Sequence, residues 1–428
     1  MQTTQSEQPL KPISLDEITE ILGLTIKKDN TNKLVTLLCM LSIFTENSQF
    51  NISFNAPSST GKSYIPMEVA SLFPQEDVLT LAYSSPMAFF HGTGKWDEKR
   101  KVMVIDLSKK IIVFQDQPHT ELLQRLRPLL SHDEKVLRVQ IADKKQKAGL
   151  KTKDIEILGF PAVVFCSAGM NIDEQEGTRF LLLSPEIDAE KIREAVYSRI
   201  EKESDYEAYI ANLNSNKKRS ELIARIVAIK QSGIKDISIK RFKGLIPNLF
   251  WETRKTPKPR HTRDIGRVIS LIKVICLLNF PYRHRYGDII EAIEDDVNQA
   301  FRLWDSISEP QEYNLPPYIY NLYWNVVVPE FIALNSDLNN SRKVGLKRED
   351  IRKRYYQETE QLLEENKLRL QILPMLQTAG LIEEHQDKND KRVLRYFPTK
   401  LTKNNSEDHW RVTEKSLHND ELLNSIIN

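Results

Sequence analysis

Cysteine is scarce in this sequence. Its 428 residues contain only Cys39, Cys166 and Cys276, which are far apart and lie in apolar stretches. Three dispersed cysteines exclude a disulfide framework, and their spacing does not match a cysteine zinc site. The pattern predicts buried thiols in a reducing compartment.

Long apolar runs are also missing. No stretch approaches the length that spans a membrane, and residues 1–11 are polar rather than signal-like. We therefore expect a cytoplasmic protein without a membrane partner. No internal repeat is visible either.

An excess of either charge is missing as well. The chain has 61 Lys and Arg against 59 Asp and Glu, a formal net charge of +2. This balance excludes a uniformly basic nucleic-acid coat, so any contact with nucleic acid must come from local patches. The composition is that of a soluble globular protein, and the length predicts two or three domains.

One short stretch carries a clear chemical signal. A strand-like run, residues 52–55, leads through a polar loop into Gly61-Lys62-Ser63 at the start of an expected helix. Backbone N–H groups and a helix N-terminus in this arrangement form a nest for phosphate oxygens. Lys62 can reach the β- and γ-phosphates of a nucleotide, and the Ser63 hydroxyl can ligate Mg²⁺. The loop, with Ser59, Thr60 and Gly61, therefore predicts a site for ATP and Mg²⁺.

The first position of this loop departs from the usual phosphate-binding pattern. Ala56 stands where that pattern has glycine. Alanine disfavours positive φ, so we expect a slightly different loop entrance. The alternative is a Ser/Thr-rich turn that contains Gly-Lys-Ser by chance. The strand before the loop and the helix after it favour the phosphate site.

A phosphate loop of this kind needs an acidic partner, and two residues are candidates. Asp116 follows the apolar run 111–114, whose β-branched and aromatic residues are typical of a strand buried on both faces. Asp106 ends the similar run 102–105. The helix expected over residues 118–130 favours Asp116, which would hold Mg²⁺ through water or polarise the attacking water. Either acid could instead be a solvated strand end.

A lysine-rich hairpin is expected between residues 136 and 157. Residues 136–141 alternate like a strand, and residues 155–157 can return antiparallel to it. The tip between them suits sequence-independent contact with phosphates, although a merely soluble loop would look the same. The nucleic-acid candidates of this tip are Lys144, Lys145 and Lys147.

Two further polar residues flank later strands. Ser167 ends the buried run 162–167 and could point at the γ-phosphate or its attacking water. Arg179 precedes the apolar run 180–183, where an ordinary salt-bridged arginine is the alternative interpretation.

Residues 188–308 are mostly helical in pattern, with expected helices over 188–201, 220–232, 263–278 and 288–304. Arg263 lies in the first turn of the third helix, where a positive charge opposes the helix dipole unless it faces an anion. This position weakly favours a phosphate partner for Arg263.

A proline-rich linker, residues 310–317, precedes a smaller unit. Its pattern is helix, helix, strand, charged turn and strand, which is that of a winged helix. Such units bind DNA or dock proteins, and both alternatives stay open here. The DNA candidates in the charged turn are Lys388, Lys391 and Arg392.

Together these features resemble the ATPase module of the minichromosome maintenance (MCM) helicases and related AAA+ proteins of phages and mobile elements. The resemblance covers roughly residues 28–310 and, more loosely, the C-terminal unit. Gln115-Asp116 falls at the family's Asp-Glu pair, and Ser167 falls at the sensor 1 position, where Asn is usual. The hairpin matches a presensor hairpin that faces a central pore.

The same resemblance implies roles for two arginines. Thr178-Arg179-Phe180 is similar to the family's Ser-Arg-Phe, whose arginine reaches the ATP site of a neighbouring subunit. The segment from Thr262 to Ile265 is similar to the lid helix that carries the sensor 2 arginine, here Arg263. The implied fold is α/β, with a P-loop core, a helical lid and a winged helix. The expected division is 1–27 (tail and short helix), 28–187 (core), 188–309 (lid), 310–345 (linker and connecting helix), 346–400 (winged helix) and 401–428 (tail).

The resemblance implies an ATP-dependent DNA translocase or helicase, a hexameric ring that replicates a mobile or viral element. Single-stranded DNA would occupy the pore. Gln115 brings no negative charge, so the alternative is a weakly hydrolysing ATP switch that acts as a loader or regulator on DNA. A P-loop kinase is a third interpretation, which the long helical region and the C-terminal unit argue against.

Overall fold

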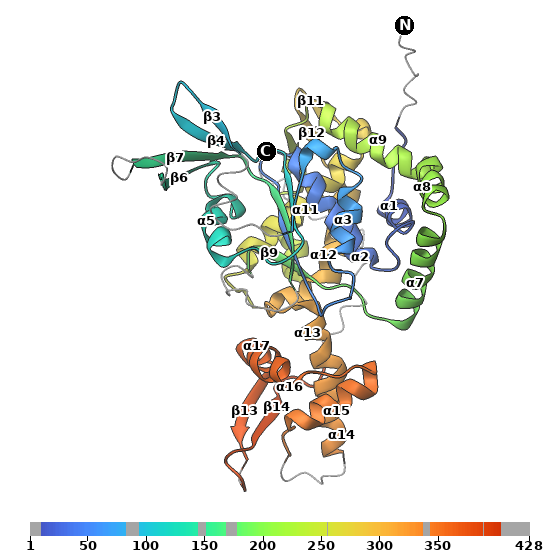
Figure 1. The fold of residues 1–428 in the computed structure, drawn as a ribbon, viewed down its shortest axis with the longest axis vertical. Coiled ribbons are helices and arrows are strands. Elements are labelled where there is room, and N and C mark those ends of the chain that lie inside the picture. The colour runs from blue at the N-terminus through green and yellow to red at the C-terminus, as the bar shows by residue number, and fades with distance from the viewer. Residues whose placement is uncertain are drawn as a thin grey trace, which may run out of the picture.

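The computed structural model describes residues 10–82, 94–143, 151–167, 178–254, 256–336, 343–387 and 389–403. It contains a larger α/β unit and a smaller C-terminal unit below it (Figure 1). The larger unit is built on a five-stranded parallel sheet in the order β2-β5-β8-β1-β9. Its strands are β1 (Asn51–Asn55), β2 (Val78–Leu81), β5 (Ile111–Phe114), β8 (Ala162–Ser167) and β9 (Phe180–Leu183).

The central strands are buried on both faces, as their apolar sequences require. Every residue of β1, β5, β8 and β9 is buried. The helices that accompany these strands in sequence are α1 (Leu15–Leu22), α2 (Asn30–Leu41), α3 (Tyr64–Ala70) and α5 (Thr120–Leu130). Ser14 caps α1 in a reciprocal capping box with Glu17.

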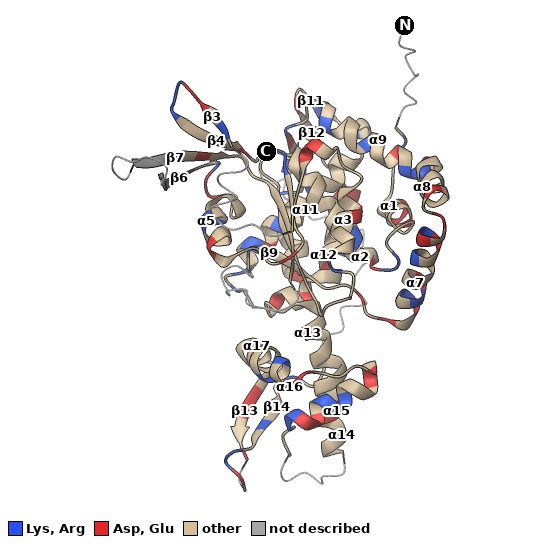
Figure 2. Ribbon diagram, viewed as in Figure 1, with Lys and Arg blue, Asp and Glu red and all other residues tan. Residues whose placement is uncertain are grey.

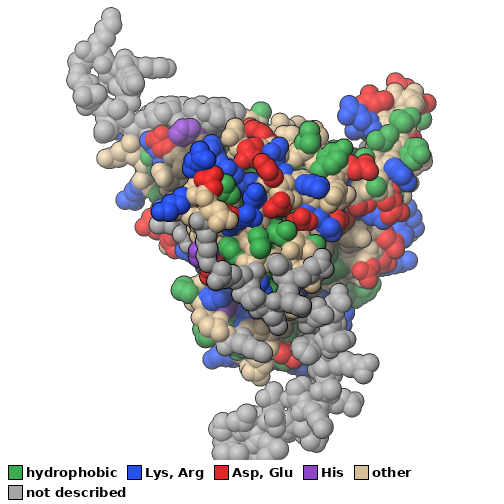
Figure 3. All heavy atoms as spheres, turned by 90° about the horizontal axis from the view of Figure 1, so that it is seen from below, with side chains coloured by type: hydrophobic (Ala, Val, Ile, Leu, Met, Phe, Trp, Pro, Cys, Tyr) green, Lys and Arg blue, Asp and Glu red, His purple; other side chains and the backbone are tan. Residues whose placement is uncertain are grey.

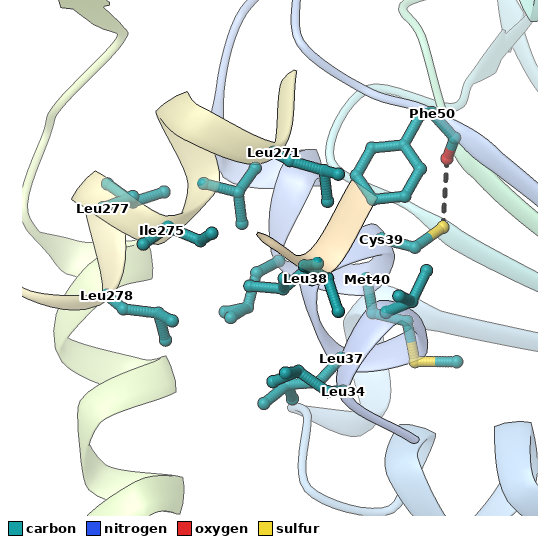
Figure 4. Close-up of a cluster of buried hydrophobic side chains, with 14 of the residues drawn as sticks. Leu34, Leu37, Leu38, Cys39, Met40, Phe50, Leu271, Ile275, Leu277 and Leu278 are labelled. Atoms are coloured by element: carbon teal, nitrogen blue, oxygen red, sulfur yellow. Dashed lines mark hydrogen bonds between the residues drawn. The ribbon is translucent and has the colours of Figure 1, made fainter. Parts of the chain in front are cut away.

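Helix α2 forms the middle of the larger core. Figure 4 shows its leucines facing the side chains of Leu271 and Ile275 from a later helix. Cys39 donates its thiol hydrogen to the carbonyl oxygen of Phe50, at 3.0 Å. All three cysteines are buried and free, as predicted.

A second sheet of four strands, in the order β3-β4-β7-β6, projects from one side of this unit (Figure 1). Strands β6 and β7 pair antiparallel from Val136↔Leu158 to Asp143↔Lys151, which confirms the expected hairpin. Its tip, with Lys144, Lys145 and Lys147, lies outside the described residues. The strand bounds are β3 (Lys95–Asp97), β4 (Val102–Asp106), β6 (Val136–Asp143) and β7 (Lys151–Leu158).

The region after β9 is helical, with one difference from expectation. The helix expected from residue 288 begins only at Glu294, because Ile289 and Ile290 pair with β10 and the Asp296 carboxylate accepts the Ile293 N–H at 2.9 Å. That helix then continues through Pro310 to Glu312, into the expected linker. The helices are α7 (Ala189–Ser204), α8 (Tyr206–Ser215), α9 (Lys217–Gln231), α10 (Leu245–Glu252), α11 (His261–Leu278) and α12 (Glu294–Glu312); the small strands are β10 (Asp236–Ser238), β11 (Arg285–Tyr286) and β12 (Ile289–Glu291).

The C-terminal unit has its own core, which runs from Leu315 to Tyr396. The segment expected to be linker and connecting helix therefore packs within this unit. Two π-helical segments, Tyr323–Val327 and Leu368–Ile372, end just before Pro329 and Pro374, where the missing N–H cannot continue the α-helical ladder. The other elements are α13 (Pro317–Leu322), α14 (Val328–Asn335), α15 (Arg348–Thr359), α16 (Glu365–Lys367), α17 (Leu373–Thr378), β13 (Ile382–Gln386) and β14 (Leu394–Pro398).

Candidate functional site

The loop between β1 and α3 has the backbone of an anion nest. Positive φ angles occur at Ser59 (66°) and Gly61 (87°), whereas Ala56 keeps an ordinary φ. The Ala56 N–H donates to the carbonyl of Ser167 at 3.3 Å, which ties the loop entrance to β8. Alanine is thus accommodated because the positive φ angles fall at later positions. Thr60 stabilises the turn by donating its hydroxyl hydrogen to the Pro57 carbonyl at 2.9 Å.

The Lys62 ammonium is half-buried in this loop. Among the described residues it has no hydrogen-bond or ion-pair partner. Its backbone carbonyl accepts from the Cys166 thiol at 3.2 Å, which fixes the chain beneath the side chain. A cation without a partner among the described residues favours the binding of an anion.

Asp116 lies beside the same loop. The Ser63 hydroxyl lies 3.4 Å from the Gln115 carbonyl oxygen, so the end of β5 meets the start of α3. The exposed Asp116 carboxylate accepts the Gln117 N–H at 2.8 Å. Asp106 ends β4 in the second sheet, where its carboxylate accepts the Ser108 N–H at 2.9 Å. The strand order therefore favours Asp116 over Asp106 as the acidic partner.

Ser167 ends β8, the strand between β5 and β1. Its hydroxyl donates to the Gln117 side-chain oxygen at 2.8 Å. Burial raises the pKa of the neighbouring Cys166 thiol to about 11; Ser63 and Lys62 oppose this shift and Asp116 adds to it. Lys62, Ser63 and Asp116 therefore all lie near the Cys166 thiol. Sequence reasoning missed Gln117 and Cys166, although both are polar positions at the ends of predicted strands.

Arg179 lies at the amino-terminal ends of the strands, opposite the phosphate loop. It precedes β9, whose Phe180 pairs with Asn51 at the start of β1. With about 3.3 Å per residue, β1 separates Arg179 from the phosphate loop by roughly 15 Å. The guanidinium Nε donates to Ser131 Oγ at the end of α5, at 2.6 Å. Arg179 therefore does not reach the loop of its own chain.

Arg263 lies at the same end of the sheet as Arg179. Its guanidinium donates to the Thr178 hydroxyl, and the residue is otherwise exposed. It is thus remote from the loop of its own chain, and its predicted nucleotide-binding role stays a prediction.

Arg267, one turn further along α11, holds the backbone on both sides of Arg179 in place. Its Nη2 donates to the carbonyls of Thr178 (2.7 Å) and Phe180 (3.1 Å), on either side of Arg179. Burial lowers the pKa of Arg267 to about 10, which the Asp264 carboxylate opposes. Sequence reasoning missed Arg267, although a charge among the apolar positions of α11 was a usable signal.

The C-terminal candidates for DNA contact are only partly described. Lys388 lies outside the described residues, and Lys391 is exposed. Arg392 is exposed but pairs with Asp390, with Nε to Oδ1 at 3.0 Å. Figure 2 shows acidic and basic residues together on β13 and β14, and Figure 3 shows the two signs interleaved where side chains are visible from below.

Comparison with known proteins gives no family for this chain: neither a scan against protein-family models nor a search of curated proteins found a match. Within the described ranges, no helix combines the length and hydrophobicity needed to cross a membrane. In the same ranges, no three His, Cys, Asp or Glu side chains gather as metal ligands would. Any inference about function therefore depends on the geometry around Lys62 and Arg179.

Proposed function

We propose that this chain is an ATP-hydrolysing DNA translocase or helicase of the MCM-like AAA+ type, active as a homo-oligomeric ring. The observation that carries the proposal is the unpaired Lys62 ammonium beside Ser63, Asp116 and Ser167, at adjacent ends of parallel strands. Polar groups at the carboxyl ends of such strands are where α/β sheets bind ligands.

Each loop residue has a defined task in this proposal. Mg²⁺-ATP would supply the phosphoryl group for transfer to water. The N–H groups from Ser59 to Lys62 and the Lys62 ammonium bind the phosphates. Ser63 and Asp116 hold the metal or its water shell, and Ser167, fixed by Gln117, orients the attacking water.

The position of Arg179 supports a site shared between subunits. It lies at the amino-terminal end of the sheet, away from its own loop, so a role at an ATP site would be at the site of another chain. A contact that joins one end of the sheet to the opposite end of the sheet in the next copy is heterologous, and such contacts form a ring when the rotation between copies closes. Arg263 lies at the same end of the sheet and would approach the same neighbouring nucleotide.

The DNA part of the proposal depends on the β6–β7 hairpin and the C-terminal turn. The hairpin carries Lys144, Lys145 and Lys147 at its tip, and the turn carries Lys388, Lys391 and Arg392. In a ring the hairpin tips would grip one DNA strand in the pore through its phosphates, and the C-terminal turn would contact duplex DNA.

A weakly hydrolysing ATP switch is the second candidate. It is favoured by Gln115, which offers no negative charge and whose amide nitrogen lies 3.7 Å from the Met67 sulfur on α3. This side chain is directed toward α3 and, as a neutral amide, cannot act as a general base.

Mixing two inactive variants tests the shared site. We expect Lys62→Ala to lose ATP binding by roughly 100-fold, the size of a charge-assisted contact. Arg179→Ala should bind ATP but not hydrolyse it. An equal mixture should regain activity at about a quarter of the interfaces, where an intact Lys62 meets an intact Arg179.

The outcomes separate the candidates. Hydrolysis stimulated by single-stranded DNA, lost in both variants and regained on mixing, supports the motor. Tight ATP binding with negligible turnover supports the switch. ATP binding by Lys62→Ala equal to that of the unaltered chain contradicts both candidates.

A further inference from the structure

The C-terminal unit is anchored directly beside the phosphate loop. The Ser184 hydroxyl, after β9, donates to the carbonyl of Asn55, the last residue of β1, at 2.6 Å. The same hydroxyl oxygen accepts the N–H of Tyr318, in the first turn of α13, at 3.1 Å. Two consecutive hydrogen bonds thus connect the residue before the loop to the C-terminal unit, which lies on this side of the sheet (Figure 1).

Lys367 extends from the C-terminal unit toward this junction. It ends α16, and its ammonium lies 5.7 Å from the centre of the Tyr318 ring, within cation–π range. The side chain is half-buried. Within the described ranges, its ammonium has neither a hydrogen bond nor a carboxylate within ion-pair distance, so the ring face is its specific contact.

The charge of Lys62 acts on Lys367 across the junction. Burial lowers the pKa of Lys367, the Glu364 carboxylate raises it, and the Lys62 ammonium lowers it further. Two half-buried lysines thus approach each other from different units, some 300 residues apart in sequence, and among the described residues neither has a carboxylate within ion-pair distance. An anion bound between the two ammonium groups would offset the desolvation cost of Lys367 and the repulsion between the two positive charges.

We propose that Lys367 is a second phosphate-binding lysine, supplied in cis by the C-terminal unit to the nucleotide on the 56–63 loop. This inference rests on the proposed function, because the anion is the triphosphate of the bound nucleotide. Nucleotide binding then draws α16 toward the loop, and the position of the C-terminal unit depends on whether the site is filled.

Equilibrium binding of a fluorescent ATP analogue to the full chain tests this role. The variants are Lys367→Met, which keeps the stem but loses the charge, Lys367→Arg, and Arg369→Met as the matched control. Arg369 is exposed two residues further along, so its removal changes the net charge equally. We expect Lys367→Met to bind about tenfold more weakly, the effect of one charge-assisted contact, with Lys367→Arg and Arg369→Met near the unaltered chain.

A second measurement separates phosphate binding from a purely structural role. Without nucleotide, the melting temperature of Lys367→Met should match that of the unaltered chain. ATP should protect the amides of residues 365–372 from hydrogen exchange in the unaltered chain but not in Lys367→Met.

Each remaining outcome contradicts the inference in a recognisable way. Equal affinity of Lys367→Met and Arg369→Met, while Lys62→Ala is weak, overturns the role of Lys367 and leaves the ATP site intact. A melting temperature lowered without nucleotide, with no selective loss of ATP protection, assigns Lys367 to domain packing. Failure of the unaltered chain to bind ATP overturns the proposed function and this inference together.

Discussion

Asp305 is a carboxyl group placed where its charge is unfavourable. It lies on α12, half-buried, close to Arg254 and Glu252 of the α10 region. Burial raises the pKa of Asp305 from 3.8 to about 6; Arg254 opposes the shift and Glu252 adds to it. The native state therefore binds a proton at Asp305 more tightly than the unfolded chain does.

This shift predicts a pH-dependent stabilisation by Asp305→Asn. The favourable contribution of protonated Asp305 is complete below about pH 4 and is lost as the pH rises through about 6. Asparagine avoids that loss, so we expect the variant to be more stable by about 1–2 kcal/mol at pH 7.5, with little gain at pH 4.5. Urea unfolding at both pH values measures the difference.

Asp295→Asn is the matched control. Asp295 is exposed on the first turn of the same helix, where a negative charge is favourable, so its removal should bring no gain at pH 7.5. An equal gain in both variants, or a pH-independent gain in Asp305→Asn, would contradict the explanation.

At the scale of elements, α7 and α8 differ from the other long helices. Neither buries a side chain, and Ile192, Val196 and Ile200 of α7 are 52, 51 and 56% exposed. Helices in proteins are stabilised chiefly by packing of an apolar face. Little packing energy therefore opposes local unfolding of these two helices.

We predict fast amide hydrogen exchange across residues 189–215. Peptides from this segment should exchange well before those of α2 and α11, which are packed in the larger core. Mass spectrometry on dilute protein measures the order. Protection of α7 equal to that of α11 under those conditions would refute the prediction, whereas protection that grows with protein concentration would indicate that another copy covers the apolar stripe.

Elements were predictable where the signal was local. The order strand, loop, helix around Lys62 could be predicted because each part has its own pattern over a few residues. The start of α12 could not, because Ile289 and Ile290 fit a helix in sequence and become strand only by pairing with β10. The placement of the phosphate loop was predictable to the same extent: the start of α3, at Ser63, and the end of β5, at Gln115, meet at the carboxyl ends of the parallel strands, on either side of β8. The location of Arg263 at the far end of the sheet depends on how α11 packs against β9, which no local pattern encodes.

At the scale of the molecule, the C-terminal unit has a hydrophobic core separate from the two hydrophobic clusters of the larger unit. The core of the C-terminal unit runs from Leu315 to Tyr396, and the short connection at residues 313–316 follows the last helix of the larger unit. The sequence places the division nearby but assigns residues 310–345 to a linker and connecting helix. Their apolar side chains, such as Ile319 and Phe331, pack in the C-terminal core instead.

We predict that residues 313–403 fold as an isolated fragment. The fragment retains its whole hydrophobic core and loses mainly the junction through Tyr318. Circular dichroism should show helical content with a cooperative thermal transition, and calorimetry of the full chain should show two transitions. A fragment without cooperative unfolding, or a full chain with a single transition, would contradict the division.

The distribution of cysteine has a practical consequence for following these two units. Every thiol of the chain belongs to the larger unit, one each on α2, β8 and α11, and each is buried. The rate of thiol alkylation therefore reports on the larger unit alone, because the C-terminal unit contains no thiol that could react. Cys166 touches the backbone of Lys62, so its alkylation rate reports the opening of the phosphate loop without any engineered label.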